Sequence, residues 1–175
     1  MTLLVKGLVI AAVHVGLVAS LGAKLLYDRA TLPRVWALTT PYDPNLPIRG
    51  RYVSLQLVVE PRGVRETKPG LLSQPPQPIN LRVEGDRLVA EATARSEDYD
   101  PFDLHLRFTD RRGEKLAMLA EPVAFFIPEH IPDPSRRPEG EELWAEVTIP
   151  KKGPPRPIRL GVKKGEGPII PLATR

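Results

Sequence analysis

Two of the three histidines have acidic neighbours, which makes them the first candidates for metal binding. His105 follows Asp103 by two residues, and His130 lies between Glu129 and Asp133. A metal site needs three or four converging ligands, commonly including histidine. Because the two groups are far apart in the sequence, they could converge only through tertiary folding. We therefore expect surface or core histidines here, and no metal site.

An acidic segment at 97–103, Glu-Asp-Tyr-Asp-Pro-Phe-Asp, offers carboxylate oxygens of the kind that bind Ca²⁺. It lacks the glycine and the twelve-residue pattern of an EF-hand loop. We expect a solvated loop at this position.

Nucleophilic catalysis has little support in the sequence. None of the serines lies in a Gly-x-Ser-x-Gly elbow, and Ser54 falls in a stretch with strand periodicity rather than in a loop. No lysine lies on another strong candidate strand, which disfavours a Ser/Lys dyad. The chain has no cysteine, so a disulfide framework and a thiolate metal site are both impossible. We predict that the protein is not an enzyme and has no cofactor.

The first 26 residues indicate that the protein is located at a membrane. Gly7 to Leu26 is apolar except for His14, Ser20 and Lys24. About 20 helical residues rise about 30 Å, the thickness of the hydrocarbon core of a bilayer. The stretch predicts an uncleaved transmembrane anchor over residues 1–30. A cleaved signal peptide stays open as an alternative, although its candidate cleavage sites lie inside the apolar run.

The orientation of this helix is not settled by charge. Lys6 precedes the apolar run, while Lys24, Arg29 and Arg34 accompany or follow its end. The positive-inside rule then favours a cytoplasmic C-terminal domain. A very short N-terminal arm, however, is typical of signal-anchors that export the chain behind them.

Small residues are arranged along one face of the helix, and we predict that they form an interface with a partner helix. Ala12, Gly16 and Ser20 repeat at four-residue spacing, which lets another helix approach closely. His14 lies on the opposite face, where an ionisable side chain is costly unless it finds a partner or stays neutral. A lone anchor without a partner remains the alternative.

Residues 31–175 predict a single β-rich domain. Prolines, 21 in the whole chain, repeatedly divide short apolar runs, and alternation with period two recurs. A Gly85-Asp86 pair predicts a hairpin, and Trp36 is expected to cap the core. We predict a mainly β fold, an antiparallel sandwich or a partly open barrel, preceded by the transmembrane helix. The candidate strands are 52–60, 79–84, 87–92, 104–109, 121–127, 143–149, 158–162 and 169–172.

The net charge of +4 is unevenly distributed. From Pro150 onward there are seven basic residues against Glu166 alone, and we describe this segment as a basic C-terminal tail. Such a segment binds anionic lipid headgroups or nucleic acid, or it is simply a solvated edge. Aromatic residues are sparse and not interleaved with the basic ones, so nucleic acid is not expected as a partner.

The segment at 43–57, DPNLPIRGRYVSLQL, resembles the GDYXXLXY family of bacterial membrane-anchored proteins. Gly50, Tyr52 and Leu55 match the motif, whereas Arg51 replaces its aspartate and Leu57 its final tyrosine. The similarity extends to the approach through Arg49, and to Phe-Phe-Ile-Pro-Glu ending at Pro128 and Glu129. Physically the motif reads as structural, with Gly50 allowing a tight start of the strand and Leu55 pointing inward.

The resemblance implies an uncharacterised family whose soluble part lies outside the cytoplasm and whose members often accompany multi-pass membrane proteins. We therefore expect a single-pass protein of the cell membrane, with its C-terminal domain on the extracytoplasmic side. Its expected partners are the lipid bilayer and an integral membrane protein. The predicted function is that of a non-enzymatic accessory or scaffold; the alternative is a binding protein for a cell-envelope ligand or metal.

Overall fold

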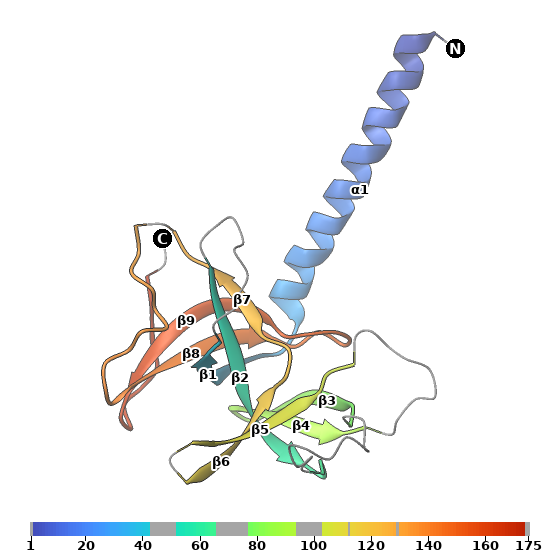
Figure 1. The fold of residues 1–175 in the computed structure, drawn as a ribbon. Helices are drawn as coiled ribbons and strands as arrows, with labels where there is room; N and C mark the ends of the chain where they lie inside the picture. Colours follow the sequence, from blue (N-terminus) through green and yellow to red (C-terminus); the bar gives the residue numbers. More distant parts are fainter. Residues whose placement is uncertain are drawn as a thin grey trace. The chain divides into compact units, whose positions relative to one another are not determined.

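The computed structural model describes residues 2–42, 52–65, 77–93, 103–111, 113–128 and 130–173. The chain divides into two compact units, Met1–Leu32 and Pro33–Arg175. The first unit is one helix and the second is a β domain (Figure 1). The division lies two residues beyond the boundary predicted from the sequence.

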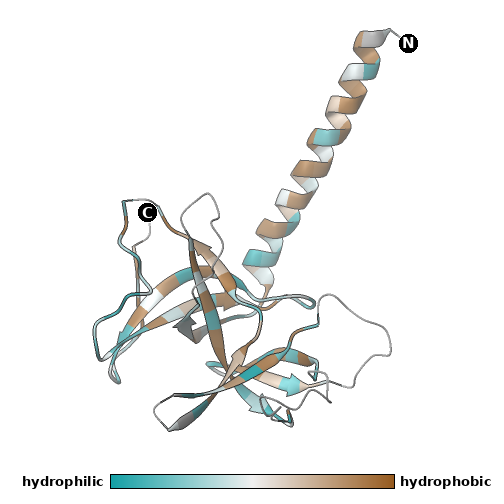
Figure 2. Cartoon of the chain, viewed as in Figure 1, coloured by the Kyte–Doolittle hydropathy of each residue, from teal (hydrophilic) through white to brown (hydrophobic). Residues whose placement is uncertain are grey.

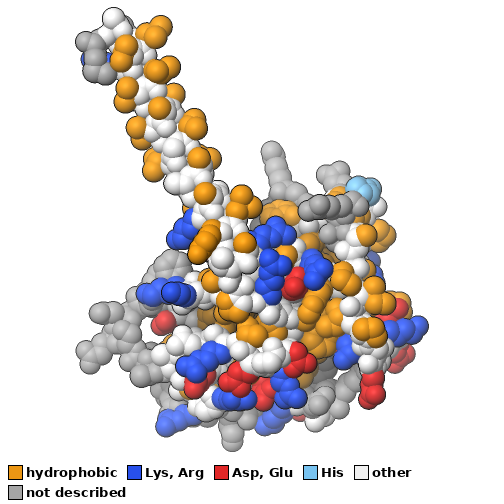
Figure 3. All heavy atoms as spheres, turned by 180° about the vertical axis from the view of Figure 1, so that it is seen from behind, with side chains coloured by type: hydrophobic (Ala, Val, Ile, Leu, Met, Phe, Trp, Pro, Cys, Tyr) orange, Lys and Arg blue, Asp and Glu red, His pale blue; other side chains and the backbone are white. Residues whose placement is uncertain are grey.

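Helix α1 spans Leu3–Thr31, and it is long and apolar enough to cross a membrane. Hydrophobic residues occur on all its sides, as Figure 2 shows by hydropathy and Figure 3 by the apolar side chains along its length. Pro33 stops the helix, because the residue before a proline is pushed out of the helical conformation. Leu32 accordingly has extended backbone angles, and its N–H donates to the Asp28 carbonyl in the last turn.

The β domain is built on one curled sheet with the strand order β10-β9-β8-β1-β2-β4-β3 (Figure 1). The sheet forms a half-barrel, which confirms the prediction of a mainly β fold and, of its two forms, favours the partly open barrel. The strands are β1 (Arg34–Pro41), β2 (Tyr52–Arg62), β3 (Ile79–Glu84), β4 (Arg87–Ala92), β5 (Leu106–Arg111), β6 (Glu114–Leu119), β7 (Val123–Phe126), β8 (Glu141–Thr148), β9 (Arg156–Lys164) and β10 (Ile170–Pro171).

Strand β2 is the central strand of the domain. Its first half pairs with β1 on one side and β7 on the other, and its second half pairs with β6 and β4. Five consecutive residues of β2, from 53 to 57, are buried, because pairing on both edges and packing on both faces cover them. The β2–β4 pairing is parallel, whereas the other strand pairs are antiparallel.

The predicted hairpin at Gly85-Asp86 is present, and β3 and β4 have the predicted bounds. Gly85 has φ +62°, a left-handed conformation that costs glycine little and other residues more. A similar glycine lies between β5 and β6. There the Gly113 N–H donates to the Asp110 carboxylate at 3.0 Å, and Gly113 has φ +81°.

Two strands and one side chain differ from the sequence prediction. Strands β1 and β6 were not expected, and both pair directly with β2. Trp36 lies in β1 between the buried Val35 and Ala37, so its ring points to the other face of the sheet and does not cap the core. The basic C-terminal segment contributes β9 and β10, as the candidate strands at 158–162 and 169–172 predicted, with β9 longer and β10 shorter than expected.

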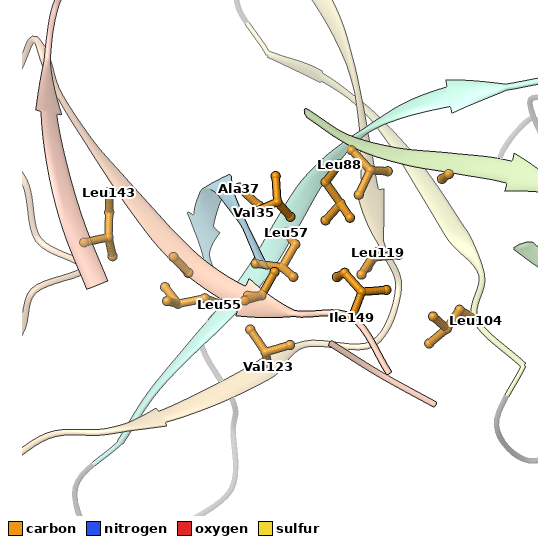
Figure 4. Close-up of a cluster of buried hydrophobic side chains, with 14 of the residues drawn as sticks. Val35, Ala37, Leu55, Leu57, Leu88, Leu104, Leu119, Val123, Leu143 and Ile149 are labelled. Atoms are coloured by element: carbon orange, nitrogen blue, oxygen red, sulfur yellow. The ribbon is translucent and has the colours of Figure 1, made fainter. Parts of the chain in front are cut away.

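The hydrophobic core lies on the concave side of the sheet. Figure 4 shows Val35, Leu55, Leu57, Leu119 and Val123 converging from β1, β2, β7 and the end of β6. Leu55 and Leu57 are fully buried. Burial alternates along β1, so Trp36 and Leu38 lie on the opposite, outer face of the sheet and are half-buried there.

Candidate docking surfaces

The predicted seam lies along one side of α1. Ala12, Gly16 and Ser20 are exposed, and a Cβ built on Gly16 would meet nothing within 4 Å. Ser20 turns its hydroxyl back to the Leu17 carbonyl at 2.8 Å, so its polar group is satisfied inside the helix. The seam is therefore smooth and small, which is the shape that allows close helix packing.

His14 on the other face is also partly satisfied within the helix. Its Nδ1–H donates to the Ile10 carbonyl at 2.8 Å, which leaves Nε2 as the ring's acceptor for an outside partner. The structure thus brings Ala12, Gly16 and Ser20 together on one face and keeps His14 apart from them.

The residues of the family motif have structural surroundings where they are described. Tyr52 opens β2, pairs with Phe126 of β7, and its ring centroid lies 6.2 Å from that of Phe126. Leu55 is fully buried, and Pro128 is half-buried beyond the end of β7. Arg49, Gly50 and Glu129 lie outside the described residues.

The histidines of the β domain do not converge with the acidic residues near them in sequence. His105 pairs instead with Glu121, its Nδ1 lying 3.3 Å from Oε1. Asp133 accepts bonds from the backbone N–H and the hydroxyl of Ser135. Within the described ranges no group of three or more histidine and carboxylate side chains is placed to hold a metal.

The outer face of strands β1, β8 and β9 carries a cluster that was not predicted, consisting of Trp36, Glu146 and Arg159. Strand register puts Trp36 beside Glu146, and Glu146 beside Arg159. The Arg159 Nε–H donates to Glu146 at 2.6 Å, and a second guanidinium nitrogen lies 3.4 Å from the other carboxylate oxygen. The same guanidinium lies 5.3 Å from the centre of the Trp36 ring, within cation–π range.

Gly161 leaves the space in which the Trp36 ring lies. A Cβ at this position would come within 2.9 Å of Trp36 and 2.7 Å of Ile169. Only a residue without a side chain lets the indole lie flat against β9 here.

The second tryptophan lies on the same outer face. Trp144 is two residues from Glu146 on β8, and the Lys163 ammonium lies 5.4 Å from its ring centre. Its indole N–H donates to Glu142 at 3.2 Å. Both tryptophans of the chain therefore lie half-buried on one sheet face, each with a cation over its ring. Tryptophan and arginine are among the residues most enriched at the energetic centres of interfaces.

A hollow of about 780 Å³ lies at the end of β1 and β8 and is lined in part by Leu38, Leu143 and Arg137. The Arg137 Nε is buried, and none of the described residues accepts a hydrogen bond from it. The Arg137 Nη1 lies 3.8 Å from a carboxylate oxygen of Glu141. The guanidinium charge in the lining suits this hollow to a ligand that carries an anionic group.

Comparisons of the chain with protein-family models, curated proteins and solved structures find no match. The resemblance to the GDYXXLXY family therefore stays a prediction from the motif at 50–55.

Proposed function

We propose that this chain is a single-pass, non-enzymatic accessory protein that docks an integral membrane partner. Helix α1 anchors it, and the seam of Ala12, Gly16 and Ser20 receives a transmembrane helix of the partner. The observation that carries the proposal is the row of small residues at four-residue spacing on one face of α1. Lipid is as apolar as leucine, so packing against small residues is what gives helix association in a membrane its specificity.

The outer face of the β domain supports the same proposal. An isolated domain has no need to display both its tryptophans outside the core, and the cation–π contacts with Arg159 and Lys163 hold the rings in place. Rigid aromatic side chains lose little conformational entropy when a partner covers them. This face gives the partner's soluble loops a docking site.

The test is purification of the full chain from its native membrane in mild detergent, with Gly16→Leu as the disrupting variant. The leucine side chain would fill the seam and hold the partner helix away. Gly7→Leu is the matched control, because nine residues at about 100° each place position 7 on the opposite side of the helix. Both glycines have open space around them, so neither change strains the chain itself.

We expect one membrane protein to remain bound to the wild type and to Gly7→Leu, and to be lost from Gly16→Leu. Equal retention by all three would mean that the helix is only a tether. A second copy of the chain as the seam-dependent partner, detected as a dimer by light scattering, would contradict the accessory role.

We further propose that the β domain lies on the extracytoplasmic side of the membrane. The chain has no cysteine, so Glu166→Cys in the exposed turn before β10 gives one labelling site. A membrane-impermeant maleimide should label this variant in intact cells. Labelling only after the cells are opened would place the domain in the cytoplasm.

The hollow at Arg137 favours a second candidate function, the binding of a small cell-envelope ligand with a carboxylate or phosphate group. The Arg137 side chain lines the hollow, and its guanidinium charge is the group that would recognise such an anion. Titration of the protein with inorganic phosphate and with acetate should raise its melting temperature, and Arg137→Met should abolish the rise. No rise with either anion would count against this candidate.

A further inference from the structure

Two segments at one edge of the β domain contain basic residues and no acidic ones. Residues 31–42 and 148–156 contain Arg34, Lys151, Lys152 and Arg156 and no aspartate or glutamate. All four basic residues are exposed. We call these four residues the basic edge.

Strand register brings the basic edge together from segments that are far apart in sequence. Arg34 of β1 pairs with Thr148 of β8, and Thr148 pairs with Arg156 of β9, so the two arginines lie at the same level of the sheet. The two lysines lie in the turn that joins β8 to β9, directly beyond that level.

A hydrogen bond ties this turn to the start of the domain. The Ile149 N–H donates to the Pro33 carbonyl at 3.2 Å. Pro33 is the first residue of the β domain, and Leu32 alone separates it from the last residue of α1. The turn with its two lysines is therefore fixed to the point where the chain leaves the helix.

Covalent lengths then limit how far the basic edge can lie from the bilayer. The apolar run ends at Leu26, and the five helical residues to Thr31 rise about 8 Å. Leu32 and Pro33 add at most about 7 Å. The headgroup layer itself takes about 5–7 Å on each side of the hydrocarbon. Pro33 is thus at most about 10 Å outside the headgroups, however the β domain is tilted against the membrane. This distance is close to one Debye length at physiological salt.

We infer that the basic edge docks on anionic lipid headgroups and so sets the orientation of the β domain on the membrane. The inference rests on α1 being the membrane anchor, which is part of the proposed function, and it is independent of any protein partner. The recognising chemistry is the charge of four cations close to phosphate. Each cation near an anionic surface raises the occupancy of the docked state about fivefold.

The test uses the full chain in nanodiscs that carry a quencher in the lipid headgroups. Pro154→Cys places a fluorescent label in the exposed turn of the basic edge, and Glu166→Cys places the same label at the other end of β9 as the control. Discs of phosphatidylcholine alone are compared with discs in which about one third of the lipid is phosphatidylglycerol, an anionic surface. The charge variant is the Lys151→Glu and Lys152→Glu pair, with circular dichroism confirming that it folds.

We expect the label at 154 to be quenched more strongly in anionic discs, and raised salt or the double glutamate variant to remove the difference. The label at 166 should respond to neither. Equal quenching at 154 in both lipids, with the protein still bound to the discs, would overturn the docking and leave the anchor standing. Loss of the protein from the discs would refute the anchor itself, and with it the proposed function.

Discussion

Gly161→Ala tests the packing of the outer tryptophan face. The added Cβ would lie 2.7 Å from the Ile169 Cγ2 atom and 2.9–3.0 Å from two atoms of the Trp36 ring. Carbon atoms in contact are normally about 3.5–4.0 Å apart. Either the indole tilts away from β9 or the strand moves, and both changes weaken the contact between Trp36 and Arg159.

The change in the free energy of unfolding caused by Gly161→Ala follows from two opposing effects. Overpacking by one methyl group costs about 1–3 kcal/mol. Replacing glycine by alanine at a position without left-handed backbone angles gains about 0.4–1 kcal/mol through the unfolded chain. We therefore expect a net destabilisation of about 1–2 kcal/mol. For a domain of this size the melting temperature should fall by about 3–8 °C.

The assay is tryptophan fluorescence of the full chain, excited selectively over tyrosine, in mild detergent during denaturant unfolding. Both tryptophans lie in the β domain and none in α1, so the signal reports the β domain alone. In a Trp144→Phe background only Trp36 emits, and Gly161→Ala should shift its emission as the ring moves.

A double-mutant cycle with Trp36→Ala isolates the contact. If the indole is what the new methyl group meets, Gly161→Ala should cost at least about 0.5 kcal/mol less once Trp36 has been removed. An equal cost in both backgrounds, together with unchanged Trp36 emission, would refute the packing described for this face.

Three further predictions concern the stability of the β domain, each measured from the denaturant midpoint. Leu57→Ala removes a fully buried side chain and should cost about 2–5 kcal/mol, whereas Phe126→Ala, at a residue 74% exposed, should cost less than about 1 kcal/mol. Glu146→Gln removes the charge that Arg159 contacts and should cost about 1–2 kcal/mol, a modest value because Arg159 is 48% exposed. Gly85→Ala forces a left-handed conformation on alanine and should cost about 1 kcal/mol; no change there would contradict the turn.

The sequence predicted the elements whose patterns are local. Strands β3 and β4 matched in both bounds, because β3 alternates with period two and Gly85 marks the turn that separates it from the short apolar run of β4. The helix was equally clear, since a continuous apolar run needs no tertiary context to be recognised.

The missed strands lacked such a local pattern. Strand β6 reads Glu-Lys-Leu-Ala-Met-Leu, which consists of good helix formers, and its pairing with β2 and β5 overrides that preference. In β1 the inward positions are Val35, Ala37 and Thr39, a weak apolar alternation directly after the helix. Only the pairing with β2 and β8 makes this segment a strand.

Of the candidate site, the seam on α1 was predictable and the outer face was not. The seam depends on spacing within one helix. The outer face depends on the register of three strands, which brings together Trp36, Glu146 and Arg159. No short-range pattern in the sequence indicates that register. The one local indication is Gly161 in the middle of a strand, where glycine often marks a close approach.

The central claim, that α1 is a partner-binding anchor, is tested most directly by photocrosslinking in the native membrane. A photoreactive amino acid is placed at Gly16 in the seam, or at Leu21, about 140° away on the exposed opposite face. The account predicts that position 16 crosslinks to one integral membrane protein and that position 21 crosslinks to lipid alone. Crosslinking to lipid alone at both positions would contradict it.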